Sequence, residues 1–200
     1  MEASASRFDQ VVSLGCSCQP AYQIRRLLSQ EEAQVFDWLI TEDGGLIHLI
    51  EGGASDLFER DDLKWIDGAM RSQRHGTRFL HECPTEGDFE TAYDAHRDRL
   101  GALAARWRSL MASDARILFV RVHAWDADPR RTAARLYATL EQAGPRLKFD
   151  LLYLTPPYVF DPLWSDASII HRPIFQPEPY TWRGDDAAWE EVLREAGALG

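Results

Sequence analysis

The chain has 200 residues, of which 45% are hydrophobic, and its formal net charge is -10. This length and apolar content can build one well-buried core, so we expect a single domain spanning residues 1–200. The acidic charge argues against a nucleic acid as a partner. No apolar run approaches the roughly 20 residues that cross a bilayer, which argues against membrane insertion.

The N-terminal segment and the cysteines indicate a compartment. Residues 1–10 are polar and lack the apolar stretch of a secretory signal. The chain has three cysteines, an odd number that is not typical of a secreted disulfide framework. We therefore expect a cytoplasmic protein whose cysteines are reduced.

The first predicted elements are a strand and a helix that flank a turn with two cysteines. Residues 10–15 predict a short buried strand, and the apolar spacing beyond the turn predicts a helix that ends near residue 30. Pro20 suits the first turn of this helix, where a missing N–H costs little. Cys18 is therefore expected at the helix N-terminus, where N–H groups and the helix dipole favour a thiolate. The alternative is that Cys18 is a buried, inert side chain.

The rest of the chain alternates between helical and strand patterns. Helices are predicted where apolar residues recur every three or four positions, and strands where β-branched and aromatic residues form short runs. These patterns predict a helix within 44–58, a strand or hairpin around 63–65, a strand over 77–84, a helix over 89–111, a strand over 115–123, a helix over 130–143, strands over 149–154 and 169–172, and a helix within 182–198. This order predicts an α/β or α+β fold in one layered domain.

Cys18 and His81 form the best candidate for a reactive pair. A catalytic thiol needs an imidazole within hydrogen-bond reach, and the two residues are usually distant in sequence. His81 falls at the end of a predicted strand, where functional sites tend to lie. A third group would orient the imidazole, and Asp37, Glu82 and Asp126 are all available. From these residues alone the choice among the three acids stays open.

Several motifs give the chain a resemblance to a known family. They are Ser13-Leu14-Gly15-Cys16-Ser17-Cys18, Phe36-Asp37-Trp38, Phe79-Leu80-His81-Glu82, Leu118-Phe119-Val120-Arg121, and Trp182-Arg183-Gly184-Asp185-Asp186 followed by Trp189. In these motifs and their spacing the chain resembles a bacterial family of unknown function described as papain-like cysteine peptidases. The resemblance implies a papain-like domain in which the Cys-bearing helix packs on a central sheet. It also implies that Cys18 is the nucleophile and His81 the base.

The resemblance further implies a reaction. A papain-like thiolate attacks an acyl carbon, so the expected substrate is a peptide, an isopeptide or another amide, and no cofactor is expected. Papain-like sites place the orienting residue after the histidine in the sequence, which favours Asp126. Arg121 and Ser17 are candidate substrate contacts, since a guanidinium binds acidic groups well and Ser17 adjoins the nucleophile. Alternatively, Arg121 and His123 simply point to a polar side of their strand.

Asp37 is expected to have a structural role. It lies between Phe36 and Trp38, which implies a partly buried place where a carboxylate must accept several hydrogen bonds. The N–H groups at the start of the next helix, Arg25 or Arg26 could donate these bonds.

Two alternatives describe a protein without this enzymatic activity. Cys16, Cys18, His81 and Cys83 carry the side chains typical of zinc ligands, and they would converge if the strand with His81 lay beside the cysteine turn. Cys16 and Cys18 could instead form a strained, easily reduced disulfide in a redox-responsive domain. The family-like pattern specifies only Cys18 and His81, so we expect a thiol enzyme without a metal.

Overall fold

The centre of the molecule is a four-stranded parallel sheet. The computed structural model describes residues 6–80, 89–123 and 128–200. The strand order is β1-β5-β6-β7, with β1 at Gln10–Ser13, β5 at Arg116–Val122, β6 at Lys148–Thr155 and β7 at Ile169–Pro173. Ser13 pairs with Val120 in the register of β1 with β5. Because the strands are parallel, their carboxyl ends meet at one edge of the sheet, and the cysteine turn lies at this edge.

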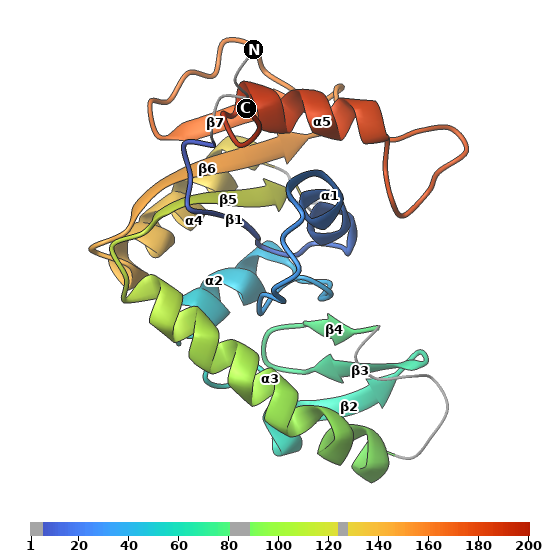
Figure 1. Cartoon of the computed structure of the whole chain (residues 1–200). Coiled ribbons are helices and arrows are strands. Elements are labelled where there is room, and N and C mark those ends of the chain that lie inside the picture. Colours follow the sequence, from blue (N-terminus) through green and yellow to red (C-terminus); the bar gives the residue numbers. More distant parts are fainter. Residues whose placement is uncertain (1–5, 81–88, 124–127) are drawn as a thin grey trace.

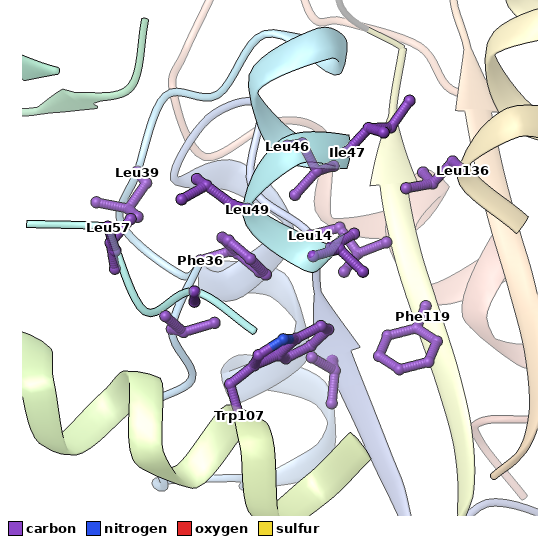
Figure 2. Close-up of a cluster of buried hydrophobic side chains, with 14 of the residues drawn as sticks. Leu14, Phe36, Leu39, Leu46, Ile47, Leu49, Leu57, Trp107, Phe119 and Leu136 are labelled. Carbon is purple, nitrogen blue, oxygen red and sulfur yellow. The ribbon is translucent and has the colours of Figure 1, made fainter. Parts of the chain in front are cut away.

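Helices cover both faces of the sheet (Figure 1). Helices α1 (Gln19–Leu28) and α5 (Asp186–Glu195) lie on one face, where Ile24 and Trp189 join the same apolar cluster as Leu118. Helices α2 (Asp43–Glu51) and α4 (Pro129–Ala143) lie on the other face, and the long helix α3 (Phe89–Met111) packs beside them. Figure 2 shows this second core, in which Trp107 of α3 faces Phe119 of β5.

The sequence of β5 explains why both faces are covered. Residues 117–120 are apolar and have no exposed surface. Successive side chains of a strand point to opposite faces, so Leu118 and Val120 face α1 and α5, whereas Ile117 and Phe119 face the other helices. A continuous apolar run of this kind is typical of a parallel strand buried on both sides.

A small antiparallel sheet lies apart from the central one (Figure 1). A single-turn 3-10 helix at Arg60–Asp62 leads into its strands β2 (Leu63–Ile66), β3 (Ala69–Ser72) and β4 (Arg78–Phe79). Asp67 and Gly68 both have positive φ angles, as the two-residue hairpin turn between β2 and β3 requires. Ile40 pairs with Arg78 through two backbone hydrogen bonds of 3.0 and 3.1 Å. This bridge ties the small sheet to the segment that follows α1.

The predicted layered α/β domain, with the Cys-bearing helix packed on a central sheet, is confirmed. The predicted elements all appear where the structure describes them, and most of them have shifted ends. The last helix begins at Asp186 because Asp185 caps it, and α2 ends at Glu51 with Gly52 as its C-cap. Residues 81–84 of the predicted strand lie outside the described residues. Within the described residues, no helix is long and apolar enough to cross a membrane.

Candidate active site

The turn between β1 and α1 has an unusual backbone. Gly15 and Cys16 both have positive φ angles, 75° and 81°. A residue with a side chain seldom adopts this conformation, and where it does so the surrounding structure must hold it. A Cβ atom at Gly15 would lie only 2.9 Å from Oγ1 of Thr41, so this position also has no room for a side chain. Gly15 and Cys16 therefore form a tight turn that leads to Cys18 at the start of α1.

Cys18 occupies the N-cap position of α1, as the sequence predicts. Pro20 lies in the first turn of the helix and has no N–H. The N–H of Gln19 donates to Oγ of Ser17 at 3.4 Å. The side chain of Ser17 thus covers one of the donors at the start of the helix, which is an internal role in addition to any contact with substrate.

Arg121 fixes the turn from inside the protein. Its side chain has no exposed surface, and Nη1 donates to the carbonyl oxygen of Leu14 at 2.9 Å and to Oγ1 of Thr41 at 2.8 Å. Nη2 donates to the carbonyl oxygen of Thr41, and both Nε and Nη2 donate to Oδ1 of Asp43. These bonds use all five N–H donors of the guanidinium. The structure therefore gives Arg121 an internal role in place of the substrate contact that we expected.

The surroundings of Cys16 bear on which cysteine of the turn could react. Both cysteines are buried, and no disulfide joins them. Burial raises the pKa of the Cys16 thiol, an effect that the positive charge of Arg121 opposes and the negative charge of Asp43 reinforces. Cys16 is therefore held as a neutral thiol at neutral pH, which makes it a poor nucleophile. This environment disfavours Cys16 as the reactive residue of the turn.

The remaining predicted catalytic residues lie outside the described residues. These are His81, Glu82 and Asp126, and the same holds for Cys83 of the alternative zinc site. Within residues 6–80, 89–123 and 128–200, no group of three or more His, Cys, Asp or Glu side chains is placed to hold a metal ion.

Asp37 has the surroundings that its aromatic neighbours predict. It is buried, and its Oδ2 accepts hydrogen bonds from Nη2 of Arg25 and the backbone N–H of Gln34, both at 2.9 Å. Arg25 also lies over the ring of Trp38. Asp37 therefore joins α1 to the segment that follows it, with Arg25 as one of the donors that we anticipated and Gln34 as one that we did not.

A second histidine lies at the same edge of the sheet as the turn. His123 directly follows β5, the strand beside β1, and its Nδ1 lies 3.0 Å from the hydroxyl of Tyr153 on β6. Tyr153 is completely buried, so this bond holds the half-buried imidazole in one orientation. His123 is the alternative to His81 that an experiment must distinguish.

The loop between β7 and α5 is fastened to the beginning of α1. Nε2 of Gln19 donates to Gln176, and Nε1 of Trp189 donates to Oε1 of Gln19. Farther along α1, Gln23 donates to the carbonyl oxygen of Arg183 at 2.6 Å. This loop also carries three large side chains that remain exposed, Phe175, Tyr180 and Trp182. Exposed aromatic side chains therefore lie on a loop that is bound to the helix that begins at Cys18.

The sequence interpretation missed Thr41 and Asp43. Both are buried, and both bind Arg121, but they lie between two predicted elements and belong to no recognisable motif. A polar residue at the start of a helix is ordinarily explained as a cap. The only available signal was the charge of Arg121 inside an otherwise apolar strand, which requires a buried partner.

Comparison with known proteins identifies the family of this chain. The family model described as "Putative papain-like cysteine peptidase (DUF1796)" matches residues 9–154, well over half of the chain. The chain belongs to this family. The matched region contains the cysteine turn, His81 and Asp126, and it ends with β6.

One curated relative of this family member comes from a virus. "Uncharacterized protein R408" of Acanthamoeba polyphaga mimivirus is 25% identical over 133 residues, which cover 55% of this chain and 60% of that protein. The chain thus spans about 60% of its relative's length. Because the relative is viral, the comparison gives no support to the bacterial source that the resemblance suggested. No solved structure matches the chain.

Proposed function

We propose that this chain is a cysteine peptidase or a related thiol acyl-transfer hydrolase, with Cys18 as nucleophile and His81 as base. One observation supports the proposed pairing of Cys18 with His81. Thr41 binds the backbone of Cys16, two residues before Cys18, and the adjacent Ile40 pairs with Arg78, three residues before His81. A two-residue segment thus joins the turn that holds the thiol to the strand that leads to the imidazole. The family to which the chain belongs supports the same chemistry.

The proposed reaction proceeds through a thioester. The Cys18 thiolate attacks the carbonyl carbon of the substrate, and a carbon–sulfur bond forms as the carbon–nitrogen bond breaks. His81 donates the proton that the departing amine requires. It then takes a proton from water, whose oxygen attacks the thioester and releases the carboxylic acid together with the Cys18 thiolate, so the initial thiolate and imidazolium are restored. Asp126 is the proposed orienting group for His81.

The beginning of α1 limits the donors that can stabilise the oxyanion. The N–H of Gln19 is bound to Ser17, and Pro20 has none. We therefore assign this role to the backbone of the preceding turn, with the N–H of Ser17 as one donor. Donors fixed before the reaction stabilise a developing negative charge most effectively, and the hydrogen bonds of the turn would provide this rigidity.

The proposed substrate is a peptide or another amide. The loop of residues 174–185 supports a substrate with an extended contact surface, because its exposed Phe175, Tyr180 and Trp182 lie on a segment bound to α1. Tyr and Trp are enriched among the residues that contribute most of the binding energy at protein interfaces. Isopeptide cleavage, amide transfer and deamidation begin with the same thioester step, so a product assay must separate them.

Alkylation of Cys18 tests the proposed nucleophile. We expect iodoacetamide at about pH 6.5 to label Cys18 faster than free cysteine, whose thiolate is scarce at this pH. Peptide mass spectrometry would assign the label, and Cys16→Ala should leave the rate of Cys18 labelling unchanged. Labelling of Cys18 at or below the rate of free cysteine would overturn the proposal.

Two histidine variants test the proposed base. His81→Ala should slow the alkylation of Cys18 at this pH, whereas His123→Ala should leave it near the wild-type rate. The reverse result would identify His123 as the base. A screen of a peptide and amide library against wild type and Cys18→Ala would then identify substrates that depend on the thiol.

A further inference from the structure

Thr41 links three parts of the molecule through one hydroxyl group. Its Oγ1 accepts a hydrogen bond from the backbone N–H of Cys16 at 3.2 Å and another from Nη1 of Arg121 at 2.8 Å. It also lies 3.4 Å from the carbonyl oxygen of Leu14, to which it donates. A hydroxyl can accept two hydrogen bonds and donate one, so every position of this group is used. Thr41 has no exposed surface, and water therefore cannot replace these bonds.

The turn that Thr41 binds is not self-supporting. Cys16 has a φ angle of 81°, which is unfavourable for a residue with a side chain. Such a conformation persists only where neighbouring groups fix it. The bond from the N–H of Cys16 to Thr41 fixes one side of this residue, and a Cβ atom at Gly15 would lie only 2.9 Å from Oγ1 of Thr41, so Thr41 is packed closely against the turn. The direction in which the chain enters α1 at Cys18 therefore depends on Thr41.

Thr41 is itself held from two sides. Its carbonyl oxygen accepts from Nη2 of Arg121 at 2.9 Å, and Arg121 is bound in turn to Asp43. On the other side, the preceding residue Ile40 pairs with Arg78 of β4. The position of the hydroxyl is thus set by the central sheet and by the strand that leads toward His81.

From these contacts we propose that Thr41 is a positioning residue for Cys18, the proposed nucleophile. This inference rests on the proposed function. Thr41 touches no reacting atom in the scheme. It holds the turn so that the thiol and the backbone N–H groups keep one orientation relative to the helix and to the strand before His81.

Two substitutions at Thr41 separate the hydroxyl from the shape of the side chain. Thr41→Val keeps the shape and removes the three hydrogen bonds, whereas Thr41→Ser keeps the hydroxyl. We expect Thr41→Val to slow the alkylation of Cys18 by iodoacetamide about tenfold, since small misplacements of reacting groups cost factors of this order. The midpoint of the pH profile of alkylation should rise as well. Thr41→Ser should restore both quantities to near the wild-type values.

Thr77 provides a matched control. Like Thr41 it has no exposed surface, and its hydroxyl binds a neighbouring side chain, Nδ1 of His75 at 3.0 Å. Thr77→Val should lower the melting temperature without changing the pH midpoint of Cys18 alkylation. This comparison separates a loss of positioning from a general loss of stability.

The possible outcomes are distinct. If wild-type Cys18 reacts no faster than free cysteine, the proposed function fails, and the role of Thr41 fails with it. If wild-type Cys18 is reactive and Thr41→Val keeps the same rate and pH midpoint, the positioning role alone is overturned. It is also overturned if Thr41→Ser fails to restore the rate, or if Thr77→Val moves the midpoint as far as Thr41→Val does.

Discussion

Arg121 and Asp43 form an ion pair inside the protein, with Nε and Nη2 of Arg121 lying 3.0 and 2.6 Å from the same carboxylate oxygen. The arginine has no exposed surface, and the side chain of the aspartate is 9% exposed. Burying a charge is costly unless it is paired and hydrogen-bonded. Five hydrogen bonds offset this cost: Arg121 donates two to Asp43 and three to Leu14 and Thr41. The ion pair therefore joins the beginning of α2 to the turn before Cys18.

Removal of one partner of this ion pair should therefore destabilise the protein strongly. Arg121→Met leaves Asp43 as an uncompensated buried charge, and we expect the free energy of unfolding to fall by about 3–5 kcal/mol. Arg194→Met is the control, because Arg194 pairs with Glu190 on the surface of α5, where a salt bridge contributes roughly 0–1 kcal/mol. Urea unfolding of both variants measures the difference. Equal effects of the two substitutions would show that the buried pair is dispensable.

Glycine substitutions test the geometry of the turn. Gly15→Ala must place a Cβ atom 2.9 Å from Thr41 at a φ angle of 75°, and we expect a loss of about 2 kcal/mol or more. Gly101→Ala should change the free energy of unfolding in the opposite direction. Gly101 lies within α3 with nothing within 4 Å of a Cβ atom, so alanine should stabilise the protein by roughly 0.5–1 kcal/mol. Thermal or urea unfolding tests both, and destabilisation by Gly101→Ala comparable with that of Gly15→Ala would contradict this account.

Local patterns in the sequence were sufficient to predict most elements of the fold. The helix predicted over 89–111 has these bounds in the structure, and the strand over 115–123 is β5, one residue shorter at each end. Cys18 was placed correctly at the start of α1 from Pro20 and the helical spacing beyond it. These features depend on residues that are close in the sequence, and there periodicity is informative.

The polar network behind the turn could not be predicted in this way. Arg121 reaches Asp43 across 78 residues and Leu14 across 107. Such contacts follow from the order of the strands, and this order is a property of the whole chain. An exposed arginine and a buried one also look alike in sequence. The charge of Arg121 in its strand indicated a polar partner, but nothing local indicated that this partner would be Asp43 and the turn rather than a substrate.

His171 should make stability depend on pH. Burial lowers its pKa to about 4, where it packs against Trp164 and binds Oγ1 of Thr155 through Nε2. The folded state therefore favours the neutral imidazole, whereas the unfolded chain binds a proton near pH 6.5. This contribution is fully present above about pH 6.5 and is lost as the pH falls toward 4. At 1.36 kcal/mol per pKa unit, the shift from 6.5 to about 4 corresponds to roughly 3 kcal/mol.

Unfolding measured from pH 7 to pH 4 in wild type and His171→Gln tests this dependence. Glutamine cannot titrate, so the difference in unfolding free energy between the two proteins should shrink as the pH is lowered. Acidic groups also titrate in this range. Burial opposes ionisation of Asp56, but hydrogen bonds from His48 and Arg74 lower its pKa. Such groups contribute equally to the stability of both proteins and cancel in the difference. A difference that stays constant over this range would show that His171 is not the titrating group.

Substitution of Asp37 and of Asp126 by asparagine should affect different properties, namely the melting temperature and the reactivity of Cys18. Asp37→Asn weakens the bonds to Arg25 and Gln34, and because a hydrogen bond to a charged group contributes roughly 1.5–3 kcal/mol, the melting temperature should fall while Cys18 stays reactive. Asp126→Asn should leave the melting temperature nearly unchanged and slow the alkylation of Cys18, because the proposed orienting charge on His81 is lost.

Asp128 supplies the control for this last comparison, since it lies two residues beyond Asp126 and caps α4 by accepting from the N–H of Arg131 at 3.0 Å. Asparagine caps a helix about as well as aspartate, so Asp128→Asn should change neither the melting temperature nor the alkylation rate appreciably. Reduced alkylation in Asp126→Asn but not in Asp128→Asn would then locate the effect at Asp126. If Asp37→Asn is the variant that slows alkylation at an unchanged melting temperature, Asp37 is the orienting residue and the assignment of Asp126 is wrong.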